Sequence, residues 1–156
     1  NMKNKFIKEY ERFIKNEILP NFKDDILFQK FPTFRVSLPE NVAVGGFHKD
    51  RDYNHSPFEI NYFLPFTRSF ETNTVWFERT PDNYEPMECD IGQYVVWDGA
   101  NTCHGNKINK TGLSRVSIDF RVIRKSDYYK DQDIKSSITS KVKFDIGNYW
   151  KILELS

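Results

Sequence analysis

Residues 104–123 read HGNKINKTGLSRVSIDFRVI. Their second half alternates strictly, which predicts a β-strand over 113–123. One face would carry Leu113, Arg115, Ser117, Asp119 and Arg121, and the other Ser114, Val116, Ile118, Phe120 and Val122. The preceding stretch, Gly105 to Gly112, is rich in Asn and Gly, which tolerate the left-handed conformations of tight connections. We therefore interpret 105–112 as a hairpin loop between a strand that ends near His104 and the strand over 113–123.

The polar face of this strand would lie either in solvent or in a cavity. If it lines a cavity, the apolar face must be covered from outside. The N-terminus offers such a cover, because apolar side chains recur there at helical spacing, namely Phe6, Ile7, Tyr10, Phe13, Ile14 and Ile18. We expect a helix over about 3–19 that packs on the sheet.

The rest of the chain predicts a mainly β protein. Further strands are expected within 26–38, where Pro32 interrupts the run, and over 58–64, 74–78 and 93–97. The loops around 68–72 and 80–89 are candidates for substrate contact. The tail should form a strand through Val142, Phe144 and Ile146, followed by an apolar segment that docks on the domain. We expect one domain over 1–156, with a β core over about 26–124 and a C-terminal extension over 125–156.

His48, Lys49 and Asp50 form a His-x-Asp triplet. Residues i and i+2 of a strand point to the same face, so His48 and Asp50 could reach one metal ion from a single strand. His104 would complete the site from another strand. Two imidazoles and one carboxylate form the facial triad that selects non-haem Fe(II) in oxygen-activating enzymes. Because unpaired ligands are costly to bury, we expect Asp50→Ala to leave the stability of the metal-free protein unchanged or improved.

An alternative metal site would combine His48, Asp50 and His55. Strand alternation places His55 on the opposite face unless 51–54 forms a turn, and this set leaves Arg115 and Ser117 without a role. His55 is then a surface group, a partner of a ligand, or a contact to substrate. Asn61 lies in a strand-like segment, where an amide needs a hydrogen-bond partner.

Taken together, the triplet, His104 and the Arg-x-Ser of Arg115 and Ser117 resemble the signature of the Fe(II)- and 2-oxoglutarate-dependent oxygenase superfamily. Within it, the chain is similar to the small oxygenases of the streptomycin-biosynthesis type. The likeness covers about 31–124 and includes the runs PTFR (32–35), HKDRDYNH (48–55), EINYFLPFT (59–67) and HGNKINKTGLSRVSIDFR (104–121). It implies a double-stranded β-helix, the jelly-roll or cupin-like fold, with iron at its mouth.

The resemblance also implies a reaction. Fe(II) would be held by His48, Asp50 and His104, with 2-oxoglutarate and O2 as cosubstrates. Arg115 and Ser117 would bind the distal carboxylate of 2-oxoglutarate, with Arg121 as the next candidate, and Asn61 would contact the cosubstrate near the metal. The expected activity is hydroxylation of a small molecule, with release of succinate and CO2. Relatives that halogenate have a small residue at the position of Asp50, which argues against halogenation.

Two other function classes stay open. A cupin-like sugar isomerase or epimerase would need a general base such as His and an acid such as Tyr, and would neither require iron nor release succinate. A non-catalytic jelly-roll binding module would tolerate loss of Asp50 or His104.

Composition restricts the partners of the protein. The net charge is +1, and Lys and Arg form no long run, so binding to nucleic acid or to an anionic membrane through a polybasic patch is not expected. No apolar stretch approaches the roughly 20 residues of a membrane span, and no signal peptide is visible. We expect a cytoplasmic protein. The sequence does not specify its oligomeric state or its substrate.

Overall fold

The computed structural model describes residues 2–43, 46–130 and 135–155. The N-terminal helix α1 spans Met2–Phe13 and continues as a π-helical turn, η1 (Ile14–Ile18), and a 3-10 turn, η2 (Leu19–Asn21). Pro20 has no N–H to continue the helical hydrogen bonds, and the helical segment ends one residue later, at Asn21. The helical segment therefore extends a little beyond the predicted range at both ends.

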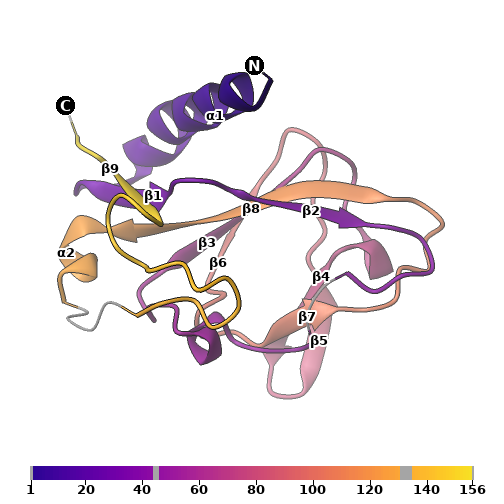
Figure 1. The fold of residues 1–156 in the computed structure, drawn as a ribbon. Helices are drawn as coiled ribbons and strands as arrows, with labels where there is room; N and C mark the ends of the chain where they lie inside the picture. Colours follow the sequence, from indigo (N-terminus) through magenta and orange to yellow (C-terminus); the bar gives the residue numbers. More distant parts are fainter. Residues whose placement is uncertain (1, 44–45, 131–134, 156) are drawn as a thin grey trace.

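The larger sheet has six strands and is antiparallel throughout. Its order is β6-β3-β8-β1-β9, and β2 also pairs with β8. The strands are β1 (Ile26–Gln29), β2 (Thr33–Ser37), β3 (Ile60–Pro65), β6 (Val95–Trp97), β8 (Arg115–Arg124) and β9 (Trp150–Leu153). The ten-residue strand β8 holds this sheet together, because it is the strand with which β1, β2 and β3 all pair (Figure 1).

The smaller sheet has the order β5-β4-β7 and is also antiparallel. It consists of β4 (Val75–Thr80), β5 (Asn83–Pro86) and β7 (His104–Asn106). Two isolated bridges, Val42 with Ile108 and His48 with His104, attach the chain before Asp50 to this sheet. Three short helical turns complete the fold: η3 (Asp50–Tyr53), η4 (Glu71–Asn73) and α2 (Lys125–Tyr128). The prediction of a mainly β protein with an N-terminal helix is confirmed.

Helix α1 and η1 cover one face of the larger sheet. Tyr10, Ile14 and Ile18 are buried against Phe28 and Phe120, and the rings of Tyr10 and Phe120 meet edge to face with their centroids 5.3 Å apart. The hydroxyl of Tyr10 donates to the backbone carbonyl of Gln29 at 2.8 Å, which satisfies a polar group that burial would otherwise penalise. The helix thus covers the apolar face of β8 and leaves the polar face turned toward the smaller sheet, which lies on the other side of β8 in Figure 1.

Three local predictions were wrong. β7 begins at His104 instead of ending there, and β7 and β8 belong to different sheets, so 105–112 is a crossover between sheets and not a hairpin loop. The expected loop over 80–89 contains β5. Residues 142–146 form no strand; Phe144 is buried against the rings of His55 and Tyr149, while β9 pairs with β1. In each case local alternation and turn residues were visible in the sequence, but the choice of pairing partner depended on tertiary contacts.

No helix in the described part of the chain is both long and apolar enough to cross a membrane.

Candidate metal centre and its cavity

The backbone brings the His-x-Asp triplet beside His104. His48 and His104 exchange two backbone hydrogen bonds, each with an N to O distance of 2.9 Å. Asp50 was predicted to lie on the same strand as His48, but it begins the 3-10 turn η3 instead. Its N–H donates to the carbonyl of Gly99 at 3.0 Å. The turn replaces strand alternation as the device that points His48 and Asp50 to the same place.

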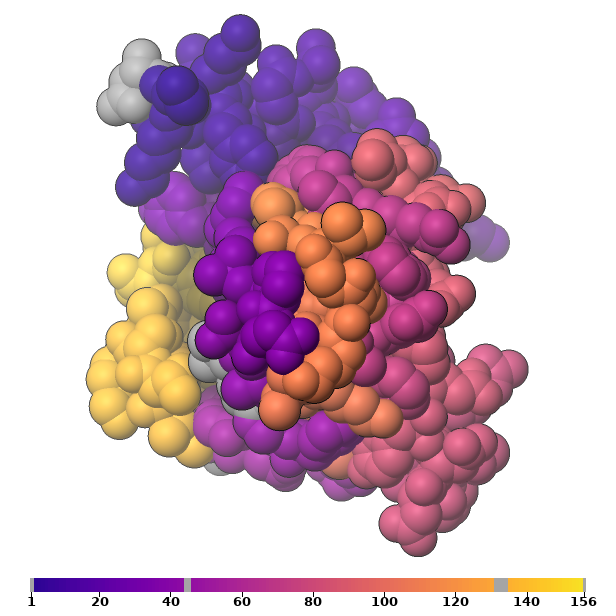
Figure 2. All heavy atoms as spheres, turned by 90° about the vertical axis from the view of Figure 1, so that its right-hand side faces the viewer, coloured from indigo at the N-terminus to yellow at the C-terminus, as the bar shows by residue number. Residues whose placement is uncertain are grey.

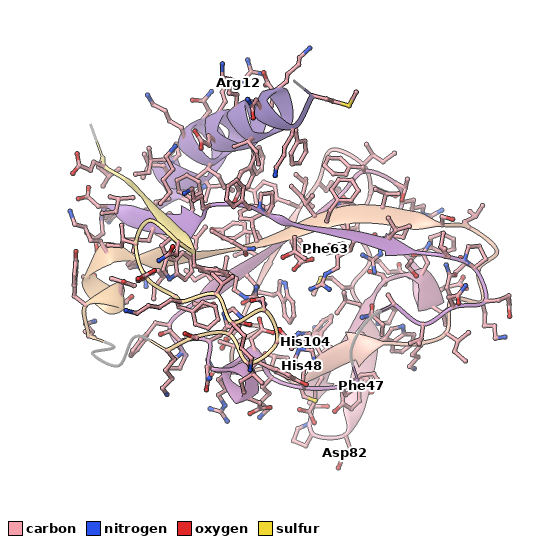
Figure 3. All side chains as sticks on the ribbon, in the orientation of Figure 1. Arg12, Phe47, His48, Phe63, Asp82 and His104 are labelled. Atoms are coloured by element: carbon pink, nitrogen blue, oxygen red, sulfur yellow. The ribbon has the colours of Figure 1, made fainter. Side chains whose placement is uncertain are left out.

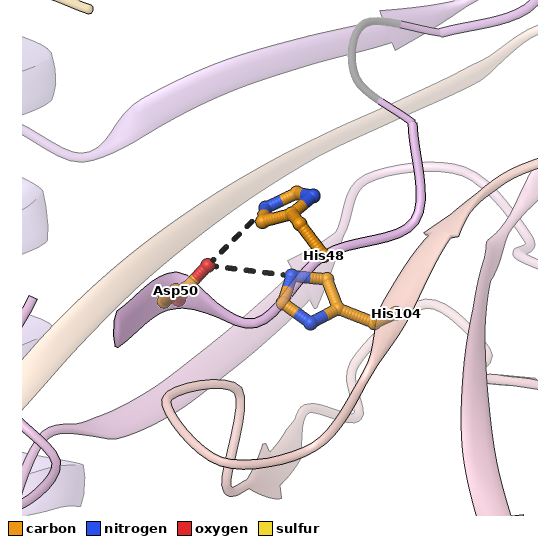
Figure 4. A group of neighbouring side chains, drawn as sticks. All are labelled: His48, Asp50 and His104. Carbon is orange, nitrogen blue, oxygen red and sulfur yellow. Dashed lines mark ion pairs between the residues drawn. The ribbon is translucent and has the colours of Figure 1, made fainter. Parts of the chain in front are cut away.

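The three side chains converge. One potential ligand atom from each of His48, Asp50 and His104 lies within 4.8 Å of the other two. The Oδ1 atom of Asp50 lies 3.5 Å from Nε2 of His48 and 3.4 Å from Nε2 of His104, as the dashed lines of Figure 4 mark. This is the predicted triad, assembled from two segments 54 residues apart.

Both imidazoles are oriented by backbone carbonyls. Nδ1 of His48 lies 2.7 Å from the carbonyl oxygen of Gly46, and Nδ1 of His104 lies 2.9 Å from that of Thr102. A carbonyl can only accept, so each Nδ1 carries the proton and each Nε2 keeps its lone pair in the neutral ring. The Nε2 atoms face Asp50 and are the atoms available to a metal ion.

The second carboxylate oxygen of Asp50 accepts hydrogen bonds from Arg121 and Asn61. Its Oδ2 accepts from Arg121 through Nη2 at 2.7 Å and Nε at 3.1 Å, and from Nδ2 of Asn61 at 2.7 Å. Burial alone would raise the pKa of Asp50, but the charge of Arg121 and the hydrogen bonds of His104 and His48 outweigh it and hold that pKa well below its usual range. Asp50 is therefore a carboxylate with one oxygen fixed and one oxygen directed at the two imidazoles.

Arg121 is the functional residue that the sequence analysis placed least well. It was an alternative to Arg115 for binding the cosubstrate, and the structure places it on Asp50. Its side chain also lies 3.5 Å from Oε2 of Glu59 and donates to the hydroxyl of Tyr149 at 3.2 Å. Strand alternation put Arg121 on the cavity face, but nothing in the sequence indicated that η3 would bring Asp50 beneath it.

His55 does not join the metal cluster. Its Nδ1 lies 2.8 Å from Oε2 of Glu59, and its ring packs against Phe144 and Tyr149. Among the described residues, the group that could hold a metal ion contains His48, Asp50 and His104 without His55. The alternative metal site is not formed.

A cavity of about 100 Å³, the inner cavity, lies between the two sheets and is lined by both the triad and Arg115. His48, His104 and Phe63, labelled in Figure 3, all line it, and so does Arg115. The Arg115 guanidinium is buried; its Nε donates to the carbonyl of Asn73 at 2.9 Å and its Nη1 to the hydroxyl of Ser117 at 2.6 Å. The ion pairs found in the described parts of the chain include no carboxylate for Arg115, and burial lowers its pKa to about 10.

The same cavity contains polar atoms without partners. The indole N–H of Trp97 and Oδ1 of Asn61 are buried and have no hydrogen-bond partner within the described residues. A Cβ on Gly99 would lie 2.5 Å from the Asn61 amide, so a glycine is needed there for Asn61 to keep its place. In the described parts of the chain, an unpaired donor, an unpaired acceptor and a buried arginine without a carboxylate partner together suit a polar, anionic guest.

A second, larger pocket of about 530 Å³, the outer pocket, is also lined by His48 and Asp50. It shares His48, Asp50, Arg35 and Arg121 with the inner cavity. One of its walls comes from the C-terminal segment, through residues such as Ser137, Ser140, Phe144 and Asn148. In Figure 2 this yellow segment lies on one side of β2 and β8, and the pink residues of the smaller sheet lie on the other. The predicted substrate loops 68–72 and 80–89 contribute no residue to the described lining of either pocket.

Comparison with known proteins identifies a homologous protein and solved structures of similar fold. The streptomycin biosynthesis protein StrG of Streptomyces griseus is 41% identical to this chain over 139 residues, which cover 89% of the chain and 66% of StrG. The chain is a homologue of StrG. It spans just under two thirds of the length of that relative. No family model matches the chain.

Among solved structures, the chain resembles the non-heme monooxygenase ThoJ. The nickel complex of ThoJ gives a TM-score of 0.54 at 16% identity, covering 65% of this chain and 45% of ThoJ. Its apo form gives a TM-score of 0.55 at 15% identity, covering 65% and 47%. At such low identities the likeness concerns the fold.

Proposed function

We propose that this protein is a non-haem Fe(II)- and 2-oxoglutarate-dependent oxygenase that hydroxylates a small molecule. The observation that carries the proposal is the inner cavity, which contains both the His48, Asp50 and His104 cluster and the buried, carboxylate-free guanidinium of Arg115. A metal triad alone would suit many enzymes. A buried arginine that lines the same cavity suits a metal enzyme whose cosubstrate has two carboxylates.

The residues present fit an Fe(II) ion. Two imidazole nitrogens and one carboxylate oxygen converge, and the second carboxylate oxygen is occupied by Arg121 and Asn61, which favours a single bond from Asp50 to the metal. When bound, iron with O2 and 2-oxoglutarate would supply the oxidising power for C–H hydroxylation, with release of succinate and CO2. Arg115 and Ser117 would bind and orient the distal carboxylate of the cosubstrate.

Other residues would position and shield the reaction. Trp97 packs edge to face on the His104 ring, with centroids 4.6 Å apart, and its free N–H could donate to an oxygen of the cosubstrate. Asn61 was predicted to contact the cosubstrate. Its amide N–H₂ donates to Asp50, so its first role would be to hold a metal ligand, and Oδ1 stays available to the guest.

We further propose that the fold is a double-stranded β-helix. The order β6-β3-β8-β1 in one sheet faces β5-β4-β7 in the other, and 42–48 continues the smaller sheet beyond β7 through its two bridges. Apart from the β4–β5 hairpin, which stays within the smaller sheet, successive strands from β2 to β8 thus cross between the sheets, which is how a jelly roll is wound. The homology to StrG and the fold likeness to ThoJ support an oxygenase of biosynthetic metabolism.

Conversion of 2-oxoglutarate to succinate tests this function. The protein, Fe(II), 2-oxoglutarate and a metabolite extract are incubated in air, and succinate is followed by proton NMR, with Asp50→Ala as the matched control. We expect succinate from the wild type at a rate well above that of the variant. Equal rates would reject the proposal and favour an isomerase or a binding module.

A further inference from the structure

The outer pocket contains charged groups, but each one already has a partner. Arg35 pairs with Asp119 at 3.0 Å, Arg121 pairs with Asp50 at 2.7 Å, and His55 pairs with Glu59 at 2.8 Å. His48 also lines the pocket, with its Nε2 3.5 Å from Oδ1 of Asp50, and the remaining described lining consists of uncharged side chains. A ligand with its own charge would therefore lose hydration without meeting an unpaired opposite charge.

The uncharged part of the wall is dense in hydroxyl and amide groups. Hydroxyls come from Thr33 on β2 and from Ser137, Thr139 and Ser140 of the C-terminal segment. Two of these hydroxyls are preorganised by a turn, in which Oγ of Ser137 lies 3.2 Å from Oγ1 of Thr139 and accepts from the N–H of Ser140 at 3.2 Å. Groups that both donate and accept in this way suit a guest with hydroxyls of its own.

Gln29 lines this pocket and carries a buried acceptor without a partner among the described residues. Its Nε2 donates to the carbonyl of Phe31 at 2.8 Å and lies 3.3 Å from Oγ1 of Thr33. A carbonyl cannot donate, so this contact fixes which end of the amide is the nitrogen. The other end, Oε1, is buried and has no partner in the described residues, and Gln29 is only 5% exposed. A buried acceptor without a partner indicates a ligand that brings an O–H or N–H group.

Aromatic faces complete the wall. Phe31 is 51% exposed, and Phe144 and Tyr149 pack edge to face with centroids 4.8 Å apart. All three line the pocket, as does Tyr53. Flat apolar faces between hydroxyl groups suit a ring that has an apolar C–H face and a polar edge.

From these observations we propose that the outer pocket binds an uncharged, hydroxyl-rich ring compound of sugar or cyclitol type, with Gln29 as a residue that selects it. The inference rests on the proposed function, since it makes this pocket the substrate site beside the metal. A volume of about 530 Å³ accommodates one or two such rings. Oε1 of Gln29 would accept a hydrogen bond from a hydroxyl of the ligand. The C-terminal residues that line the pocket would contact the ligand and contribute to its selection.

Binding of simple polyols tests the proposal without metal or cosubstrate. Methyl α-D-glucopyranoside, myo-inositol and sucrose serve as neutral probes, and glucosamine and gluconate as charged ones. Saturation-transfer NMR measures contact with the protein. We expect transfer to at least one neutral probe and a roughly tenfold weaker affinity for it in Gln29→Met, which keeps the length of the side chain but removes the acceptor. Gln93→Met, the same change at an exposed residue, should bind like the wild type.

Phe144→Leu gives a second readout that does not depend on Gln29, because it keeps apolar volume and removes the ring. It should weaken the same probe severalfold, with the unfolding curve recorded to confirm the fold. Transfer to none of the neutral probes, transfer to the charged probes alone, or equal affinity in Gln29→Met and the wild type would overturn the proposal. Because this assay contains no iron and no 2-oxoglutarate, its failure would leave the succinate result intact, and the reverse also holds.

Discussion

Replacing Arg115 with Gln should change the stability of the ligand-free protein little and weaken its binding of 2-oxoglutarate strongly. Burial lowers the pKa of Arg115 from 12.5 to about 10, and each pKa unit corresponds to ~1.4 kcal/mol, so a charged guanidinium costs about 3 kcal/mol in the ligand-free protein. Its hydrogen bonds to Asn73 and Ser117 offset much of that cost. Arg115→Gln should therefore change the free energy of unfolding of the ligand-free protein by no more than about 1 to 2 kcal/mol.

The affinity for 2-oxoglutarate should change far more. Removing one partner of a buried charge pair costs about 2 to 5 kcal/mol, which corresponds to a loss of roughly 30-fold to several thousand-fold. Arg115→Lys should fall between the wild type and Arg115→Gln, since it keeps the charge and loses the planar fork. Calorimetric titration of the Mn²⁺-loaded protein measures these affinities, and Arg79→Gln, an exposed arginine on β4, is the matched control. Unaltered affinity in Arg115→Gln would refute the reasoning.

Further predictions concern the metal ligands. Asp50→Ala should abolish metal binding and, because it leaves Arg121 buried opposite Glu59 alone, destabilise the metal-free protein by about 3 kcal/mol in urea unfolding; unchanged stability would contradict the pairing and restore the expectation from sequence. Arg121→Met should weaken Co²⁺ binding roughly 10- to 100-fold by freeing Oδ2 of Asp50, whereas the exposed Arg124→Met should not. The pKa of His48 is raised, chiefly by Asp50, so the protonated ring stabilises the metal-free protein below pH ~6.5 and that contribution is lost as the pH rises through the raised pKa. Metal must displace this proton, so Co²⁺ affinity should fall as the pH drops from 8 to 6, and a flat profile would count against His48 as a ligand.

The sequence was most informative where a pattern is local. The alternation of 113–123 correctly put Arg115 and Ser117 on one face, and helical spacing correctly put Tyr10, Ile14 and Ile18 on the sheet. The His-x-Asp spacing predicted convergence with His104, although Asp50 reaches it from a 3-10 turn and not from a strand.

The remaining features depend on contacts between distant segments. The pairing of Arg121 with Asp50 joins residues 71 positions apart, and the local sequence around each residue does not indicate its partner. The C-terminal segment was expected to serve packing, and it also forms a wall of the outer pocket through short polar residues that have no periodicity. The free acceptor of Gln29 could not be predicted, because it follows from the turn that occupies the other end of its amide.

The central claim is that one cavity accommodates both a metal on the triad and a keto acid on Arg115. Anaerobic addition of Fe(II) and then 2-oxoglutarate, followed by visible absorption, tests it most directly, because only a ligand set with adjacent open positions lets a keto acid chelate the metal. We predict a visible charge-transfer band that requires both additions, is absent in Asp50→Ala and needs far more 2-oxoglutarate in Arg115→Gln. Tight iron binding by the wild type without any such band would contradict the claim.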